Sequence, residues 1–600
     1  MLDLDSQQLE RLSIIGILLL IGAIVIVILT PPATGYEPSM YGALPVPFWI
    51  GLVGAMFVGA FVILANAWQP AGNTWRYGLG LVLLSNVLLI ALPYLRGYRM
   101  YGRSDAMSHL GFVQDIAVSG TIDGNIYPPL HLLTLSVVES TNLDVMTVGM
   151  LLPVVFASVY FGGMFFLLLV WFDDEQIVLL SLPFVLLPVL RHAHVGHRPF
   201  DVSIMLLPLL LYLLVWSQRV PNPGVRAVFV LALGGLLFYH PLTGFFVIYV
   251  LLIYVGSMRF PILYDRGVSP THLASIGAAI FLIWYSNFTG IILRFNTLFD
   301  TLFGTGSGEP PADAYVGVVQ EVTPAMVDLL RVFVFRYGLE FIIFGLAFAF
   351  IGVAVLRALG GEYEPDSVTG TLVGTVVLFS IGGVSFLILD LIVPMERPFQ
   401  LAKIAAIVLV GRLFVLIYPG NASLDRQITS RRSAQTVLVV AVGILMILAV
   451  FSLYPSPLGS QNNHQVTATE VDGSEWLASH GTAAGELSQF HMSFRRFHHA
   501  AHGVNAELPF RGERPPPHFN YQHEPTYGEN YGEDRYLSLN ELGRTMYPEV
   551  FPRYPENWRY TPADFDRLEQ DSSVERVYDN GEYDVYYVHA GATADEMESD

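Results

Sequence analysis

Long apolar runs alternate with short polar connections along the first three quarters of the chain. About 20 consecutive apolar residues are enough to cross the hydrocarbon core of a membrane as a helix. The pattern therefore predicts a polytopic α-helical membrane protein with about 11 to 13 transmembrane helices. The predicted runs are 12–30, 48–67, 77–95, 146–172, 176–190, 201–217, 227–239, 243–256, 271–290, 332–356, 371–393, 401–418 and 436–454.

The longest polar interruption in the first half of the chain is the segment 96–145. Asp105, His109 and Phe112 recur at helical spacing and share one face of a predicted helix. Glycines then end this helix, and Tyr127 with two following prolines starts a second helix that is too short to span. We predict that both helices lie at the membrane surface; an amphipathic loop that only anchors the fold is the alternative. The candidate catalytic residues are Asp105, His109 and Asp115.

The chain becomes polar and acidic after residue 454. Thr561 and Asp564 have the spacing of a helix capping box, and an Asn-Gly turn follows between two runs rich in tyrosine and valine. These signals predict a helix and a β-hairpin in a small α/β domain. The predicted domains are 1–76 (N-terminal transmembrane helices), 77–454 (main transmembrane domain, with 96–145 as its catalytic loop) and 455–600 (extracytoplasmic α/β domain).

Arginine in short loops favours the cytoplasmic side of a membrane. With the N-terminus inside, the loops that carry Arg76, Arg219, Arg226 and Arg357 are predicted to be cytoplasmic. The connections predicted to lie outside are 31–47, 96–145, 191–200, 291–331, 394–400 and the tail from 455.

Composition narrows the function classes. The chain has 51 acidic and 31 basic residues, and Lys403 is the only lysine. The acid excess argues against nucleic acid as a partner, which requires basic surfaces. An acidic, lysine-poor chain is typical of a halophile, although coding bias can also deplete lysine. The absence of cysteine excludes disulfides, thiol catalysis and cysteine-ligated zinc.

Arginine also occurs in the predicted outer connections, where the orientation rule does not explain it. Arg294 and Arg336 flank one of them, and a charge near the start of a span is costly unless it is paired or functional. Arg397 follows Glu396 in the short turn PMERPFQ. Guanidinium groups bind phosphate through two hydrogen bonds, so such a cluster suits a lipid phosphate; arginines that merely reach lipid headgroups are the alternative. The candidate substrate-binding residues are Arg103, Tyr127, Arg198, Arg336, Glu396 and Arg397.

The connection RHAHVGHRPFD contains three closely spaced histidines. His192, His194 and His197 have a spacing that could hold a metal ion, with Asp201 as a fourth ligand. Solvated loop histidines are the alternative interpretation.

The segment SDAMSHLGFVQDI, followed by a glycine and NIYPPLHLL, resembles the first extracytoplasmic loop of GT-C glycosyltransferases. This superfamily includes protein mannosyltransferases, aminoarabinose transferases and the catalytic subunits of oligosaccharyltransferases. As architecture the resemblance covers 77–420; as a motif it covers 104–133 and, weakly, 394–400. It implies that Asp105 stands at the position of the family's catalytic aspartate and Arg397 at that of the basic residue that holds the donor phosphate.

The chain departs from the family pattern in two ways. The acidic loop follows the third predicted span and not the first, so 12–67 resembles an added helical pair. The tail lacks the WWDxG motif of oligosaccharyltransferase subunits, so transfer of a single sugar fits better than transfer of a whole oligosaccharide. Together with the acidic composition, the resemblance favours a haloarchaeal member of the superfamily.

The resemblance implies a membrane glycosyltransferase that moves a sugar from a polyprenyl- or dolichyl-phosphate donor to a glycan, glycoprotein or glycolipid acceptor at the outer face. Asp105 would act as the base, with inversion at the sugar, and no cofactor or metal is expected. The partners would be the lipid-linked sugar, the acceptor and membrane lipids, but not nucleic acid. A flippase or transporter for lipid-linked sugars and a non-catalytic envelope protein are the alternatives. Few polar residues fall deep inside the predicted spans, which favours the enzyme; they are Asp390, Lys403 and Arg412.

Overall fold

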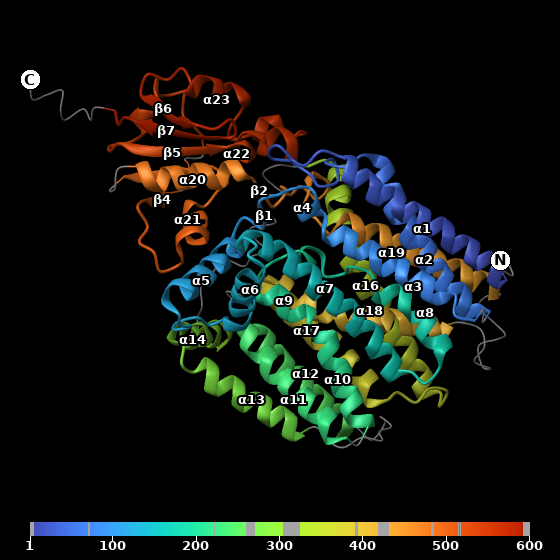
Figure 1. Cartoon of the computed structure of the whole chain (residues 1–600). Coiled ribbons are helices and arrows are strands. Elements are labelled where there is room, and N and C mark those ends of the chain that lie inside the picture. The colour runs from blue at the N-terminus through green and yellow to red at the C-terminus, as the bar shows by residue number, and fades with distance from the viewer. Residues whose placement is uncertain are drawn as a thin grey trace, which may run out of the picture.

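The computed structural model of the chain (Figure 1) describes residues 5–591 apart from 70–71, 221, 260–270, 304–323, 390–393, 418–430, 482–484, 514 and 516–517. Within these residues, nine helical segments are long and apolar enough to cross a membrane, and four shorter apolar helices accompany them. Each predicted apolar run overlaps one of these helices, so the prediction of a polytopic α-helical membrane protein is confirmed. Asp390 lies outside the described residues.

The long segments are α1 (Ser6–Leu29), α2 (Val46–Trp68), α7 (Val145–Trp171), α9 with α10 (Pro199–Met205 and Leu207–Arg219), α12 (Pro241–Arg259), α16 (Met326–Leu359), α17 (Ser367–Ile388), α18 (Glu396–Ile417) and α19 (Arg431–Phe451). The shorter helices are α3 (Trp75–Ile90), α8 (Glu175–Val185), α11 (Pro223–Tyr239) and α13 (Thr271–Tyr285).

Aspartates fix the starts of several of these helices. Asp144 accepts hydrogen bonds from the backbone amides of the first turn of α7, and Asp174 and Asp366 do the same for α8 and α17. A side-chain carboxylate at this position satisfies amides that have no partner inside the helix. Among the long segments, α18 is the most deeply buried, and it packs against α8, α16 and α17.

The two predicted surface helices are present as α5 (Asp105–Ser119) and α6 (Pro128–Thr141). Gly120 ends α5 with a left-handed backbone (φ 69°), which glycine adopts without a steric penalty. Both helices lie at the end of the bundle that carries the C-terminal sheet (Figure 1).

The C-terminal part is an α/β unit, as predicted. Its five-stranded sheet has the order β4-β3-β5-β7-β6, with the predicted Asn-Gly hairpin forming β6 and β7. Thr561 and Asp564 form the predicted capping box. The strands are β3 (Glu486–Gln489), β4 (Arg511–Glu513), β5 (Arg535–Asn540), β6 (Val574–Asp579) and β7 (Tyr583–Val588); the helices are α20 (Ala468–His480), α21 (Phe494–His502), α22 (Glu541–Thr545) and α23 (Pro562–Leu568).

Helix α21 docks directly on α5 (Figure 1). Gly111 permits this contact, because a Cβ atom there would collide with the carbonyl group of His499. The Ser108 hydroxyl lies 2.9 Å from Nδ1 of His499, and the carboxylate of Asp115 accepts a hydrogen bond from the backbone amide of Val504 (3.0 Å). The C-terminal unit therefore rests on the helix that begins with Asp105.

The structure differs from the sequence prediction at two of the connections. Part of 291–331 forms helix α14 (Thr289–Phe303), whose polar residues interrupt the apolar run that a sequence search requires; 304–323 lie outside the described residues. Glu396 and Arg397, predicted in a turn, lie in the first turn of α18.

Candidate functional site

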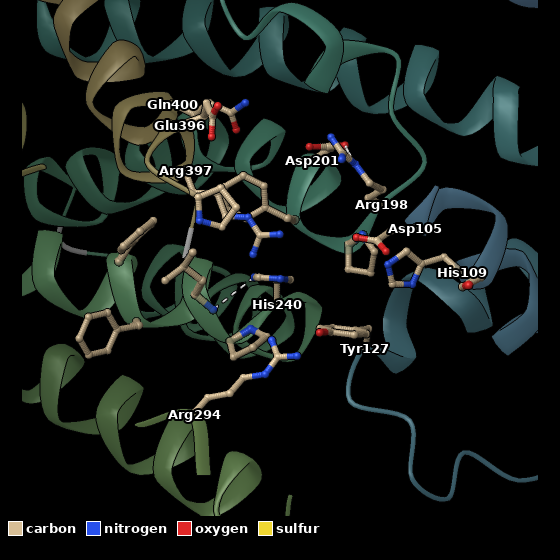
Figure 2. Close-up of a pocket in the computed structure, with 18 of the residues that line it drawn as sticks. Asp105, His109, Tyr127, Arg198, Asp201, His240, Arg294, Glu396, Arg397 and Gln400 are labelled. Carbon is tan, nitrogen blue, oxygen red and sulfur yellow. Dashed lines mark hydrogen bonds and ion pairs between the residues drawn. The ribbon is translucent and has the colours of Figure 1, made fainter. Parts of the chain in front are cut away.

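A cavity of about 660 Å³ opens at the end of the bundle where α5 and α21 meet (Figure 2). Its walls include segments far apart in the sequence: α5, α9, α12, α14, α17, α18 and α21. The charged residues that line it are Asp105, Arg198, Asp201, Arg294, Glu396, Arg397 and Arg496.

Asp105 occupies the first position of α5, and its side chain is about half exposed (49%). Nη2 of Arg496, on α21, lies 2.8 Å from Oδ1 of Asp105, and Nη1 of Arg496 donates a hydrogen bond to Ser108 Oγ (2.9 Å). Within the described part of the chain, Oδ2 of Asp105 has no hydrogen-bond partner. The C-terminal unit thus supplies a cation that holds one oxygen of this carboxylate and leaves the other open to the cavity.

The other arginines fall into two kinds. Arg198 is neutralised by the buried carboxylate of Asp201, at 2.5 Å. Arg397 lies over the ring of Phe200 at 4.9 Å, and across the described residues neither Arg397 nor Arg294 has a carboxylate partner. Figure 2 shows both guanidinium groups pointing into the same space as Asp105. The cavity therefore presents two guanidinium groups to an anion, with Glu396 as the remaining acidic residue of the lining.

Aromatic and imidazole rings form a continuous wall beside these charges. The rings of Tyr127 and His240 are stacked with centroids 5.4 Å apart, and His240 meets Phe200 edge-on at 5.2 Å. His109 lies against Tyr127 at 5.5 Å. The wall continues into purely apolar side chains: Phe112, Leu242, Phe245, Phe246, Ile291 and Phe386.

A buried pair of histidines supports the wall from behind. Nδ1 of His109 lies 3.1 Å from Nε2 of His131, whose Nδ1 lies 2.8 Å from the side-chain nitrogen of Asn125. Burial lowers the pKa of His131 to about 3 and, with the neighbouring imidazole of His131, holds the pKa of His109 well below its ordinary value. Both rings are therefore neutral at neutral pH and fix each other by hydrogen bonding.

This pair makes stability depend on pH. An unfolded chain takes up a proton at each histidine as the pH falls below about 6.5, whereas folded His131 does so only at about 3, so stability should fall progressively within this window. We expect the thermal-unfolding midpoint to drop between pH 7 and pH 5, and His131→Gln to flatten that dependence. His480→Gln, at an exposed histidine, should leave the slope unchanged. Equal slopes in wild type and His131→Gln would contradict this account.

The structure brings six predicted site residues to the cavity and places three elsewhere. Those that line it are Asp105, His109, Tyr127, Arg198, Glu396 and Arg397. Asp115 lies outside because its carboxylate binds the backbone after α21. Arg103 forms a buried ion pair with Glu470, and Arg336 lies over the ring of Tyr337.

The three histidines of the 191–200 connection do not converge. His192 lines the cavity, His194 stacks on Phe161, and His197 lies 3.0 Å from the hydroxyl of Thr134. Asp201, the predicted fourth metal ligand, accepts a hydrogen bond from Arg198. In the part of the chain that the structure describes, no group of three or more His, Asp or Glu side chains is placed to hold a metal ion.

Sequence reasoning missed His240, Gln400 and Arg496 as lining residues. His240 had a detectable signal, since it is a polar residue before a proline between two apolar runs. Arg496 had none, because nothing in FRRFHHAAHG indicates that this helix packs on α5, about 390 residues earlier.

No family model matches the chain, and the curated proteins include no match. Among solved structures, the chain is similar to ArnT from Cupriavidus metallidurans bound to undecaprenyl phosphate, with 11% identity, 86% of this chain and 99% of that chain covered, and a TM-score of 0.43. It is also similar to the arabinofuranosyltransferase AftD from Mycobacteria, with 14% identity, 86% of this chain and 42% of that chain covered, and a TM-score of 0.47. The Archaeoglobus fulgidus oligosaccharyltransferase tethered to an acceptor peptide is similar with 12% identity, 80% of this chain and 71% of that chain covered, and a TM-score of 0.44. Because these TM-scores lie below 0.5, the chain's own residues must carry any inference about function.

Proposed function

We propose that this chain is a GT-C-like membrane glycosyltransferase that uses a polyprenyl- or dolichyl-phosphate sugar as donor. One observation carries the proposal: Asp105 shares a cavity with two arginines that have no carboxylate partner among the described residues, and one wall of that cavity is apolar. A lipid-linked sugar phosphate has the matching parts, namely an anion, a polar sugar and a hydrocarbon chain.

The donor phosphate would lie between Arg294 and Arg397. Neither has a carboxylate partner among the described residues, and fixed cations stabilise the charge that develops on a departing phosphate. The lipid chain would follow Phe245, Ile291 and Phe386 along the apolar wall. The sugar would then face Tyr127 and Asp105.

The reaction would be a single displacement. The acceptor hydroxyl oxygen forms a bond to the anomeric carbon as the bond from that carbon to the phosphate oxygen breaks, with inversion at the sugar. The bonding electrons remain on the lipid phosphate, where Arg294 and Arg397 neutralise them. Oδ2 of Asp105 receives the hydroxyl proton; a positioned base of this kind contributes about 10²- to 10⁴-fold to the rate.

The proposed orientation places the cavity and the sheet outside the cell. Arginines at the opposite helix ends, such as Arg226 and Arg357, support it through the positive-inside rule. A haloarchaeal source is part of the proposal, supported by a net charge of −20 and a single lysine.

The intramembrane charges favour an enzyme over a transporter. Lys403 on α18 is paired with Glu340 on α16 at 3.0 Å, and Arg191 lies 3.4 Å from the same carboxylate. These charges pair with one another and line neither of the two cavities around Arg496, so they offer no accessible polar path for transport.

The test is mass spectrometry of surface glycans and lipid-linked sugars from wild-type and deletion strains. We expect the deletion strain to lose one sugar from an acceptor and to accumulate the corresponding lipid-phosphate sugar. Unchanged glycans and lipids in the deletion strain would contradict the proposal.

A further inference from the structure

A second cavity, of about 510 Å³, lies between the C-terminal unit and the start of α5. Arg496 lines both cavities, and Ser104, the residue before Asp105, lines the second. The two cavities therefore meet at the ion pair between Arg496 and Asp105. No step proposed above uses the second cavity.

The second cavity is cationic although the protein as a whole is strongly acidic. Arg103, Arg496 and Arg559 line it together with two histidines, and no carboxylate belongs to its described lining. Arg103 is neutralised by Glu470 and Arg496 by Asp105, whereas no described acid pairs with Arg559. Arg559, whose side chain is exposed, is therefore the lining arginine that an anion can bind.

The remaining lining groups suit a polyhydroxylated ligand. Asn462, Gln489 and Tyr547 each carry groups that donate or accept hydrogen bonds, as sugar hydroxyls also do. His491, beside them, has a left-handed backbone (φ 49°), a conformation that costs energy for a residue other than glycine and recurs at ligand sites.

We infer that the second cavity binds the acceptor, and that this acceptor is a sugar bearing a carboxylate, such as a uronic acid. The inference rests on the proposed transferase function and adds the acceptor class to it. The acceptor carboxylate binds Arg559, and its ring lies between Tyr547 and Arg496. The other end of the ring then faces Arg496, the residue that lines both cavities and holds Asp105.

The experiment measures binding of p-nitrophenyl glucuronide and of the neutral p-nitrophenyl glucoside to the purified full-length protein in detergent, by saturation-transfer NMR titration. We expect the glucuronide to bind about tenfold more tightly, because a charge-assisted hydrogen bond is lost with the glucoside. Arg559→Gln should remove this preference without weakening the binding of the glucoside. Arg495→Gln, at an exposed arginine on α21 outside both cavities, is the matched control and should retain it.

Equal binding of the two probes, or a preference that survives Arg559→Gln, would overturn the inference. A short acidic peptide is a third probe, and a preference for it over the glucuronide would also overturn the sugar assignment. Binding of undecaprenyl phosphate to the same preparations separates the two proposals. If the lipid phosphate binds and the glucuronide preference is absent, the acceptor assignment fails alone; if the lipid phosphate does not bind, the proposed function fails.

Discussion

Replacing Asp105 with Asn should lower the turnover of sugar transfer by about 10²- to 10⁴-fold while leaving donor binding nearly unchanged. The substitution keeps the shape of the side chain but removes the oxygen that receives the acceptor proton. The ion pair between Arg496 and Oδ1 holds the acid in position beside the cavity. The measurement is the rate of sugar transfer at saturating donor, with lipid-phosphate binding measured separately.

Two further substitutions of the same kind serve as controls. Asp123→Asn changes an exposed aspartate in the connection after α5 and should leave turnover unchanged. Asp115→Asn tests the other candidate base, whose carboxylate accepts hydrogen bonds from the backbone amides of Val504 and Asn505. Full activity in Asp105→Asn with loss in Asp115→Asn would move the base to Asp115 and contradict the geometry.

Replacing Arg397 with Gln should weaken binding of the lipid phosphate by about 10- to 100-fold, because a charge-assisted hydrogen bond to a phosphate is lost. Arg397 sits in the first turn of α18 against Phe200, and no described carboxylate competes for it. The loss should appear in donor affinity and KM, and the helix should remain folded because the residue lies at its end.

Arg397→Lys tests whether the phosphate is bound by the paired hydrogen bonds of the guanidinium group or by its positive charge alone. Lysine keeps the charge but cannot form the paired hydrogen bonds of guanidinium, so intermediate affinity is expected. Arg226→Gln, on an exposed position of α11 outside the cavity, should bind donor normally. Unchanged donor affinity in Arg397→Gln would exclude this arginine as a phosphate ligand.

Local sequence patterns predicted the helices well, because the formation of a helix or a hairpin depends mainly on residues that are close in the sequence. The apolar runs, the capping box at Thr561 and the Asn-Gly hairpin all appear where the sequence placed them. Helix α14 was missed because it is amphipathic and carries Arg294 within its turns, which breaks the apolar run on which the search for spans depends.

The site residues could be predicted only where several of them lie in one short segment of the sequence. Asp105, His109 and Tyr127 were visible in a single loop, and Arg397 stood out beside a span. Arg103 lies outside the first cavity and lines the second, where Glu470, 367 residues away along the chain, neutralises it in a buried pair that no local pattern indicates. Arg496 was missed for the same reason, since only the docking of α21 on α5 brings it to Asp105.

The most direct test uses purified protein in lipid nanodiscs, with lipid-phosphate sugars extracted from the deletion strain as donor. The cellular acceptor fraction is added, and release of free polyprenyl phosphate is measured by mass spectrometry. We expect release with wild-type protein and a loss of about 10²-fold or more with Asp105→Asn. If wild type releases no lipid phosphate, but moves the intact lipid-linked sugar across the bilayer of a liposome, the chain is a transporter and the transferase account is wrong.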